Sequence, residues 1–482
     1  MTNNGTVISQ GTKAAQGLTI TGNLTEGTSS TTAVALGDPL AVKGTASLNG
    51  TMEVLGAPSG YTVKSTEPLV NAGTLSGTFG TLTFASGVFY TGTLAYTPTQ
   101  VNVALTQTSV TATALGAPLA SPQTVHAAEN LQGALDVSNQ WLTRGQMAGH
   151  AAWGQAAGAF LSAPTLASAV TSLNSLSGEI YGTGRAVESE LALATDQAIA
   201  HRQNALAQGQ GAGVWVLGTG TSGMLEGSGY DSADYRSAGT LAGIDGSFGS
   251  FSAGIAGGRT RVDSHIGALG GDVEGREDLL AAYARANLSD GGYLAGRVGY
   301  AHVRNEINRS LLLGTTLTPI SGAHTDHLTL ASLEGGKTLG HWTPYVSLSA
   351  LRIDQSAFAE NGANGMGLAA PSQTHTASFA DLGLRYGDAF QWSGGQSWFG
   401  AYADYRRVLG GANLGIDASF VGVPDSTFVA EGQNLPRNTG ILGAEFSTQV
   451  NARWGWFLDG DYQTANGGGH AGEVDAGVRL AF

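Results

Sequence analysis

The sequence predicts an all-β protein: a twelve-stranded transmembrane β-barrel of the outer-membrane type with a pore-spanning α-helical linker, preceded by the end of a β-helix. Three observations lead to this prediction. Apolar and ionisable side chains alternate through the last part of the chain, the connections between the alternating runs differ systematically in length, and the composition changes twice. Three parts are therefore expected, at 1–125, 126–210 and 211–482.

Composition and charge exclude several classes of function. A net charge of −14 argues against binding nucleic acid, which needs a basic face. The chain has no cysteine, so disulfides, thiolate zinc sites and cysteine nucleophiles are excluded. No run of roughly 18 apolar residues predicts a transmembrane helix, whereas the strands of a transmembrane barrel need only about 9–11 alternating residues. The first residues lack the features of a secretion signal, so either the protein has none or the chain is a fragment that begins downstream of one.

Residues 1–125 contain short β-like runs that end at glycines, for example 17–22, 40–44 and 51–56. Such runs favour a stack of short parallel strands, a β-helix, in which each coil buries its inward side chains against its neighbours. An ordinary β-sandwich is the alternative. The stretch 99–106 alternates apolar and polar residues and predicts a half-buried strand.

Residues 126–210 are predicted to be helical, at 127–145, 148–162, 165–175 and 184–208. The last helix would be ~37 Å long, enough to cross the ~30 Å core of a bilayer. It cannot face lipid because it carries charged side chains. We therefore expect it either inside a water-lined pore or on the surface between domains. Its ionisable residues are Arg185, Glu188, Glu190, Asp196, His201 and Arg202.

Residues 211–482 carry the strongest signal. In the strand expected at 452–464, Trp454 and Leu458 share one face, and Asp459 and Asp461 share the other. Too many strands follow this pattern, without a second sheet to cover them, so the apolar face is expected to meet lipid and the ionisable face to line a lumen. The lumen would be lined by Arg285, Arg297, Asp381, Arg385, Glu445, Asp459, Asp461 and Arg479. These residues either clamp the 184–208 helix or simply provide the polar lining of a wet pore.

The predicted strands number twelve, an even number as single-chain bacterial barrels require. They are expected at 211–222, 235–247, 250–262, 275–288, 291–306, 322–338, 342–356, 374–388, 397–409, 436–449, 452–464 and 470–482. Long connections, such as 263–274 and 307–321, alternate with short ones, such as 248–249 and 289–290; the connection 389–396 is intermediate and 465–469 departs from the pattern. If the short turns are periplasmic, the 184–208 helix must run down the pore from the outside.

Several stretches resemble one protein family. The segment containing Leu176, Ser177, Gly178, Glu179 and Tyr181 resembles the linker motif of type Va autotransporters, which secrete part of themselves. Residues 213–218, 236–245 and 254–258 resemble the first three barrel strands of that family, and 90–105 resembles the autochaperone region that nucleates folding of its β-helical passengers. The C-terminal row Val478, Leu480 and Phe482 is similar to the signal that the barrel assembly machinery reads.

This resemblance, which covers roughly 70–482, implies an outer-membrane translocator that exports its own N-terminal passenger to the bacterial cell surface. The parts would be a truncated passenger (1–125), a linker (126–210) whose segment 184–208 lies inside the barrel, and the translocator barrel (211–482). A surface adhesin or structural β-helix anchored by the barrel is the alternative. The implied partners are outer-membrane lipid, the barrel assembly machinery and periplasmic chaperones, with a monomeric barrel and no nucleic acid.

Catalytic and metal-binding patterns are weak. The G-x-G-x-x-G at 218–223 ends a strand without entering a helix, so it lacks the context for binding a dinucleotide. His324 and His327 lie three positions apart, on opposite faces of a strand, and no metal site or cofactor is predicted. Some autotransporters cleave their pore helix through an asparagine, with carboxylates assisting. Asn204 is the candidate for such self-cleavage here, with a plain lumen residue as the alternative. No other enzymatic activity is expected on this chain.

Overall fold

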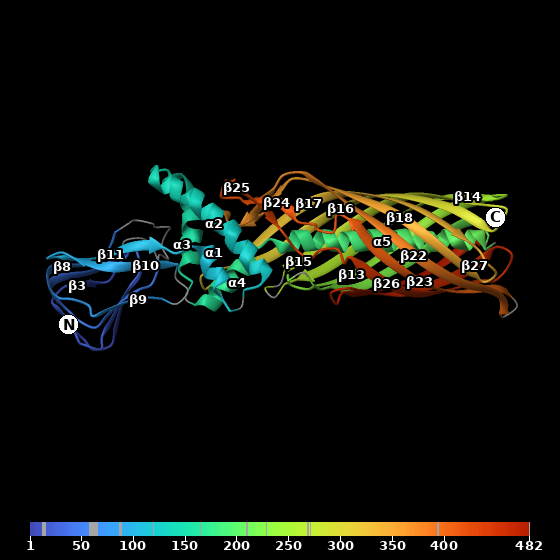
Figure 1. Cartoon of the computed structure of the whole chain (residues 1–482). Helices are drawn as coiled ribbons and strands as arrows, with labels where there is room; N and C mark the ends of the chain where they lie inside the picture. Colours follow the sequence, from blue (N-terminus) through green and yellow to red (C-terminus); the bar gives the residue numbers. More distant parts are fainter. Residues whose placement is uncertain are drawn as a thin grey trace.

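The computed structural model describes residues 1–11, 16–56, 66–85, 89–118, 120–163, 165–208, 211–227, 229–267, 269, 271–392 and 395–481. The molecule is elongated (Figure 1). A β-rich part lies at one end, a barrel forms the other, and several helices lie between them.

The N-terminal part is a parallel β-helix with two stacked sheets. One sheet has the order β1-β4-β6-β8, with β3 beside β6, and the other has the order β2-β5-β7-β9. Equivalent positions of successive coils stack in register, as Val34, Val54 and Phe84 do. Val34 and Val54 are fully buried, so each coil completes the core of the next. The strands are β1 (Thr2–Asn3), β2 (Thr6–Ser9), β3 (Thr19–Ile20), β4 (Leu24–Glu26), β5 (Thr31–Val34), β6 (Leu40–Leu48), β7 (Thr51–Val54), β8 (Glu67–Gly77) and β9 (Thr81–Phe84).

An antiparallel hairpin closes this β-helix on the side of the barrel. Its strands are β10 (Tyr90–Tyr96) and β11 (Gln100–Gln107), and β11 also pairs antiparallel with β8. Val101 and Val103 are completely buried, as the alternation at 99–106 predicts. The hairpin gives the open sheet edge left by β8 a partner, which satisfies its backbone groups.

The helical part begins at Val110, upstream of the composition change near residue 126. Its elements are α1 (Val110–Leu115), α2 (Pro122–Thr143), η1 (Met147–His150), α3 (Ala151–Leu161), α4 (Leu166–Leu176) and α5 (Glu179–Ala207). Ser121 and Thr165 begin α2 and α4 with capping boxes. Within the described ranges, none of the helices combines the length and the apolar character needed to cross a bilayer.

The last helix, α5, begins five positions before the predicted residue 184. Glycines at 182 and 184 lower the intrinsic helix propensity of this stretch. Tertiary packing overrides that preference, because the helix backbone at Gly182 lies against Gly432, where an added Cβ would come within 2.9 Å of the Gly432 nitrogen. Propensity alone therefore places the start of α5 too late.

The C-terminal part is a closed antiparallel barrel of twelve strands. Neighbours along the chain pair with each other, β16 pairs with β17, and β12 pairs with β28 to complete the ring. The strands are β12 (Gly213–Leu225), β13 (Ala233–Phe248), β14 (Phe251–Ile266), β15 (Gly271–Asn287), β16 (Gly292–Leu313), β17 (Thr316–Lys337), β18 (Trp342–Gln355), β22 (Gln373–Trp392), β23 (Gly395–Gly410), β26 (Asn438–Gln449), β27 (Trp454–Ala465) and β28 (His470–Ala481).

The connections differ from the predicted pattern. Strand β16 continues to Leu313 and β17 starts at Thr316, so a tight turn replaces the long loop expected at 307–321. The loop expected at 263–274 is likewise mostly strand. The polar residues in these stretches predict loops. Where two strands extend together, however, ladder hydrogen bonds satisfy the backbone whether or not apolar and polar side chains alternate.

Two connections remain long, 356–372 and 411–437, and both form small structures at the rim next to the helices. They contain β19 (Phe358–Ala359), β20 (Asn361–Gly362), η2 (Ala363–Gly365), β21 (Leu368–Ala370), β24 (Ile416–Phe420) and β25 (Val423–Ala430). Strands β19, β21, β24 and β25 form a separate four-stranded sheet.

The outer face of the barrel is apolar. Leu280, Leu382 and Leu442 each expose 64–70% of their surface, far more than large aliphatic residues normally expose to water. Near the rim with the short turns, Trp392 and Phe446 contact edge to face with ring centroids 5.5 Å apart. An apolar band bordered by aromatic residues is the outer surface of a barrel that sits in a bilayer.

Candidate functional site: the barrel lumen and its helix

Helix α5 lies inside the barrel and runs along its length (Figure 1). Its 29 residues correspond to ~43 Å, more than the thickness of a bilayer core. It contacts strands β13 to β17 and the rim strand β25. Most of its side chains are buried, although the helix as a whole is polar. The predicted pore helix charges therefore meet the barrel wall.

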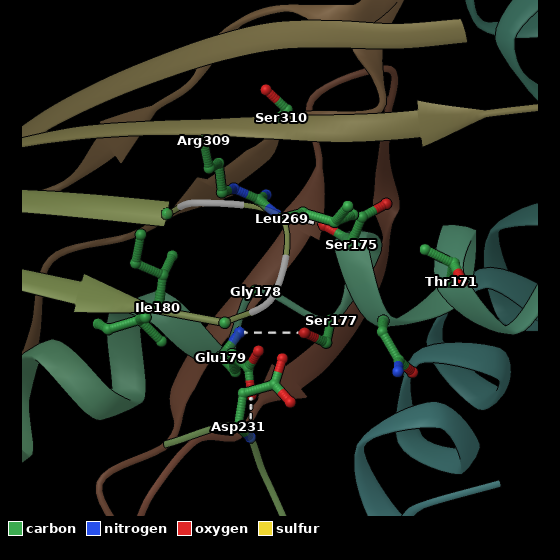
Figure 2. A pocket seen from close by; sticks show the side chains of 14 residues that line it. Thr171, Ser175, Ser177, Gly178, Glu179, Ile180, Asp231, Leu269, Arg309 and Ser310 are labelled. Atoms are coloured by element: carbon green, nitrogen blue, oxygen red, sulfur yellow. Dashed lines mark hydrogen bonds between the residues drawn. The ribbon is translucent and has the colours of Figure 1, made fainter. Parts of the chain in front are cut away.

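The linker motif forms the entrance of the helix into the lumen. Leu176 ends α4, and Gly178 takes a left-handed conformation (φ 71°) that turns the chain into α5. Glu179 then accepts hydrogen bonds from the Gln123 side chain (2.6 Å) and from the Asp231 backbone (3.1 Å). Ser177, Gly178 and Glu179 line a cavity of about 160 Å³ at this junction. Figure 2 shows these residues from close by.

Tyr181, the last residue of the motif, joins the helix to the barrel rim. Its hydroxyl donates to Glu360 Oε1 (2.9 Å), and its ring stacks on Phe358 at 4.3 Å. Arg309 of β16 donates to both oxygens of Glu360 at 2.8 Å. The linker motif, the long connection 356–372 and the barrel wall therefore share one buried network.

A second contact at this rim involves Tyr230, in the connection between β12 and β13. Its hydroxyl donates to Glu431 (2.8 Å) and lies 2.7 Å from His126 Nδ1 of α2. Burial and the neighbouring Glu431 carboxylate raise the pKa of Tyr230 above its ordinary value, so the phenol keeps its proton and remains a donor. This contact ties α2 to the barrel rim.

In the middle of the lumen, acidic residues of α5 meet donors of the wall. Arg297 Nε donates one hydrogen bond shared between the two carboxylate oxygens of Asp196 (3.0 and 3.1 Å), and the Ser332 hydroxyl donates another (2.9 Å). Glu188 accepts from the Asn305 side chain at 2.5 Å. Glu190 lies within electrostatic range of Arg406.

Arg202 anchors the far end of the helix. Its guanidinium donates to both carboxylate oxygens of Asp245 at 2.7 Å. The two side chains expose only 2% and 0% of their surface. Asp245 also accepts from the Tyr283 hydroxyl (2.9 Å) and from the backbone of Gly213, the first residue of β12 (3.0 Å). One carboxylate thus holds the end of α5 and the start of the barrel together.

The predicted lumen residues all lie on the inner wall, but with different partners. Arg297, Arg285 and Asp461 reach α5 directly, through Asp196, Asn204 (2.7 Å) and Gln197 (3.0 Å). Asp459 lies 4.0 Å from His201 of the helix. The others bind wall residues: Arg385 to Glu334, Asp381 to Arg406, Glu445 to Trp398 and Arg479 to Gln449. Some members of the set therefore contact the helix and others contact only the wall, and their roles as a clamp or as polar lining stay predictions.

Asn204 is buried, and its side-chain oxygen accepts from Arg285. The carboxylates considered for its self-cleavage lie elsewhere along the helix. Asp196 is the nearest of them, yet it lies about two turns from Asn204, ~12 Å along the helix axis, and it is bound to Arg297. The helix geometry therefore keeps Glu188, Glu190 and Asp196 away from Asn204, and self-cleavage there stays a prediction.

The C-terminal row lies partly within the described residues. Val478 exposes 49% of its surface on the outer face, and Leu480 on the same face is half-buried. Arg479 between them points into the lumen and is buried. Phe482 lies outside the described residues.

The main residues that sequence reasoning missed are Asp245, Asn305, Glu334 and Glu360. Asp245 and Glu334 could have been found from alternation, since each lies next to an exposed apolar residue, Ile244 and Leu333 respectively. Asn305 lies at the end of a predicted strand and Glu360 in a predicted loop, where alternation carries no signal. Among possible ligands for a cation, Glu188, His324 and Asp326 form a group that is considered below.

Comparison with known proteins supports one family. The model of the autotransporter beta-domain family matches residues 214–461, which is more than half of the chain. No curated protein matches the sequence. The solved translocator domain of the autotransporter NalP from Neisseria meningitidis is similar with a TM-score of 0.51 and 20% identity, covering 63% of this chain and 99% of that one. The beta domain of the Bordetella autotransporter BrkA gives a TM-score of 0.41 and 19% identity, covering 56% and 100%.

The likeness to the first of these structures concerns the fold, a closed barrel of the translocator type. The family model covers most of the barrel, from the second residue of β12 to Asp461 in β27. Together with the twelve closed strands, this match identifies the chain as a member of the autotransporter beta-domain family.

Proposed function

We propose that this chain is an outer-membrane translocator that exports its own N-terminal passenger, here the β-helix, to the bacterial cell surface. The observation that carries the proposal is the course of α5. The helix passes through the lumen and joins the β-helical part to the first barrel strand. A chain caught in its own pore is what export through, or together with, the barrel would leave behind.

The topology supports a single orientation of the barrel in the membrane. Strand β12 starts beside the end of β28, where Gly213 pairs with Ala481. The turn 249–250 follows β13 at the same rim as Gly213, because Val214 pairs with Ile244. If the short turns face the periplasm, the rim with the long connections and the β-helix faces outward, as in other outer-membrane barrels.

The proposed partners follow from the surface of the barrel. The exposed leucines of the outer face favour outer-membrane lipid. Each of the twelve described barrel strands is paired on both sides, so these strands offer no free edge for pairing with a second copy of the chain. We therefore propose a monomeric barrel. The exposed row that contains Val478 is the proposed signal for the barrel assembly machinery, with periplasmic chaperones guarding the chain before insertion.

Cysteine labelling on whole cells tests the direction of export, because the chain has no cysteine of its own. Thr25, exposed on β4, and Ser250, exposed in the turn 249–250, are replaced singly by cysteine behind a cleavable secretion signal. A membrane-impermeant maleimide should label the Thr25→Cys variant on intact cells. The Ser250→Cys variant should be labelled only after the outer membrane is permeabilised.

Heat-modifiable migration on gels identifies folded barrels in both samples. If folded Thr25→Cys protein were labelled only after permeabilisation, the passenger would be inside the cell and the proposal would fail. Labelling of Ser250→Cys on intact cells would show that the orientation is reversed.

A further inference from the structure

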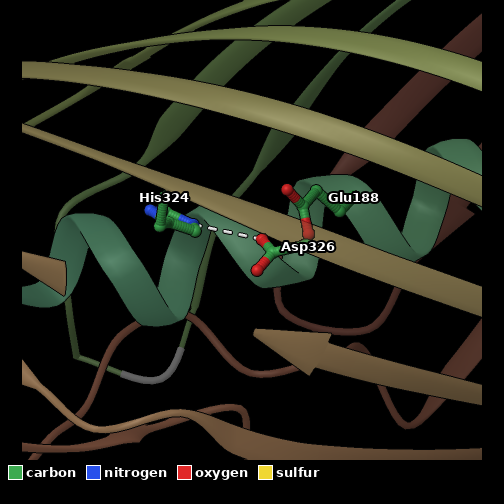
Figure 3. A group of neighbouring side chains, drawn as sticks. All are labelled: Glu188, His324 and Asp326. Carbon is green, nitrogen blue, oxygen red and sulfur yellow. Dashed lines mark ion pairs between the residues drawn. The ribbon is translucent and has the colours of Figure 1, made fainter. Parts of the chain in front are cut away.

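Three ligand-type side chains meet between the pore helix and the wall. Glu188 comes from α5, and His324 and Asp326 come from β17 (Figure 3). Their ligand atoms all lie within 4.8 Å of one another. His324 Nε2 is 3.1 Å from Asp326 Oδ2, which is close to the roughly 3.3 Å between two ligands that each lie 2.0–2.1 Å from a tetrahedral ion.

The group is buried and incompletely satisfied. The side chains of His324 and Asp326 expose 6% and 0% of their surface. Within the described part of the chain, Glu188 Oε2, Asp326 Oδ1 and His324 Nδ1 are buried without a hydrogen-bond partner. Buried polar atoms, and carboxylate oxygens above all, normally have partners because leaving them unpaired is costly.

The hydrogen bonds that do exist bring the two carboxylates together. Asn305 Nδ2 donates to Glu188 Oε1 (2.5 Å) and lies 3.1 Å from Asp326 Oδ2. A single amide therefore lies against one oxygen of each carboxylate, and the two carboxyl groups also approach each other directly. Two carboxylates at this separation repel each other in a buried site unless a positive charge or a shared proton joins them.

The surrounding charges do not neutralise the group. Glu277 of β15 lines the same cavity as Glu188, as does Arg185, which lies one turn earlier on α5. The guanidinium of Arg185 is directed to Gln355 (2.8 Å) and to the Gly415 carbonyl (3.2 Å). Among these facing groups, three carboxylates oppose one guanidinium, so the site keeps an excess of negative charge.

Space for an ion exists beside the group. The cavity lined by Glu188, Asn305 and His324 has about 20 Å³ of room, which corresponds to roughly one water-sized sphere. A single cation fits such a space. A larger organic ligand does not fit.

We propose that Glu188, His324 and Asp326 bind one divalent transition-metal cation, with Zn²⁺ as the best match, and that this ion fastens the pore helix to the barrel wall. One imidazole and two carboxylates, without sulfur, are ligands suited to Zn²⁺ with an open fourth position for water. The site goes beyond the proposed export function, because a barrel that exports nothing would still bind the ion.

Metal content of the purified full chain tests the site. The untagged protein, folded in detergent, is stripped with a chelator, equilibrated with Zn²⁺ and dialysed, and metal is counted by mass spectrometry. The wild type should retain one Zn²⁺ per chain. Glu188→Gln, His324→Gln and Asp326→Asn should each weaken Zn²⁺ binding at least tenfold.

The matched control is His327→Gln. His327 lies on the same strand but on the outer face, 3.5 Å from His302 Nδ1, where two histidines offer an alternative surface site. The control should bind Zn²⁺ as the wild type does. Loss of Zn²⁺ in His327→Gln with retention in His324→Gln would assign the metal to the surface pair and overturn the proposal.

X-ray absorption on the wild type keeps the test valid if a lumen variant fails to fold. The proposal expects a first shell of nitrogen and oxygen near 2.0–2.1 Å with one imidazole. Two imidazoles would contradict it. The absence of any saturable Zn²⁺ binding would also overturn it and would indicate that the two carboxylates share a proton instead. The metal measurements and the labelling experiment for export are independent, so failure of one does not decide the other.

Discussion

At the scale of single residues, the helix is held in the pore by buried polar contacts rather than by apolar packing alone. The ion pair of Arg202 and Asp245 is the most enclosed of the described pairs between α5 and the wall. Such a pair does not by itself guarantee high stability, because desolvation opposes the attraction between the charges. Its two parallel hydrogen bonds do fix where the helix ends relative to β12.

Arg202→Gln should lower the free energy of unfolding by about 3–5 kcal/mol, because it leaves the Asp245 carboxylate buried without its cation. The double variant Arg202→Gln/Asp245→Asn should recover part of this loss, since no buried charge remains. Urea unfolding of the detergent-folded chain measures both. The control is Arg352→Gln, whose exposed pair with Asp354 should contribute nothing measurable. Equal midpoints for Arg202→Gln and Arg352→Gln would contradict the anchoring role.

Two glycines near the start of α5 should respond in opposite directions to alanine. Gly178 is left-handed, and an added Cβ would clash with Leu368, so Gly178→Ala should destabilise by at least ~1–2 kcal/mol. Gly184 is helical with open space around its Cβ position, so Gly184→Ala should stabilise by ~0.5–1 kcal/mol. Thermal unfolding of the two variants compares them directly. A stabilising Gly178→Ala would show that the turn between α4 and α5 is not strained.

At the scale of elements, α5 occupies the lumen of the closed barrel. A lumen enclosed by twelve strands is wide enough to hold a helix, because the width grows with strand number. The buried ionisable side chains on the barrel strands include more carboxylates than guanidiniums, and this excess of negative charge favours cations in the lumen. They are Asp245, Glu277, Asp326, Glu334, Asp459, Glu473 and Asp475 against Arg285, Arg297, Arg309, Arg406 and Arg479.

Deletion of 184–208 should therefore open a channel with clearly larger single-channel conductance in planar bilayers, while the barrel still folds. The open channel should prefer cations, because the wall carries the excess of acidic groups. Reversal potentials in a KCl gradient measure this preference. If the intact and deleted forms conducted alike, α5 would not occlude the pore, although the barrel assignment would remain.

At the scale of the whole molecule, three architectures follow one another along a single chain. The antiparallel hairpin of β10 and β11 ends the β-helix, the helices α1 to α4 pack at the barrel rim, and α5 enters the lumen. The rim network of Tyr181, Glu360 and Arg309 joins the helix entrance to the wall. The start of α5 is thus fastened to the barrel by buried polar contacts.

The sequence by itself determined the barrel, its twelve strands and, where apolar and ionisable residues alternate clearly, the face on which a side chain lies. These features are local: a period of two assigns Trp454 to the outside and Asp459 to the inside without knowledge of any neighbour. The polar character of α5 was equally visible in the sequence, but its start was not, because tertiary packing extends the helix to Glu179. Strand ends were not, because the ladder of β16 and β17 continues through polar residues that alternation does not mark.

Only the tertiary structure decided which residues meet. Arg202 and Asp245 are 43 positions apart, and Tyr181 and Glu360 are 179 apart. His324 was assigned correctly to the face opposite His327, yet its proximity to Glu188 could not be foreseen. The period of a strand fixes the face of a side chain but not its height in the barrel or the side of the helix it meets. Those depend on the stagger of the strands around the closed ring and on how far α5 enters it.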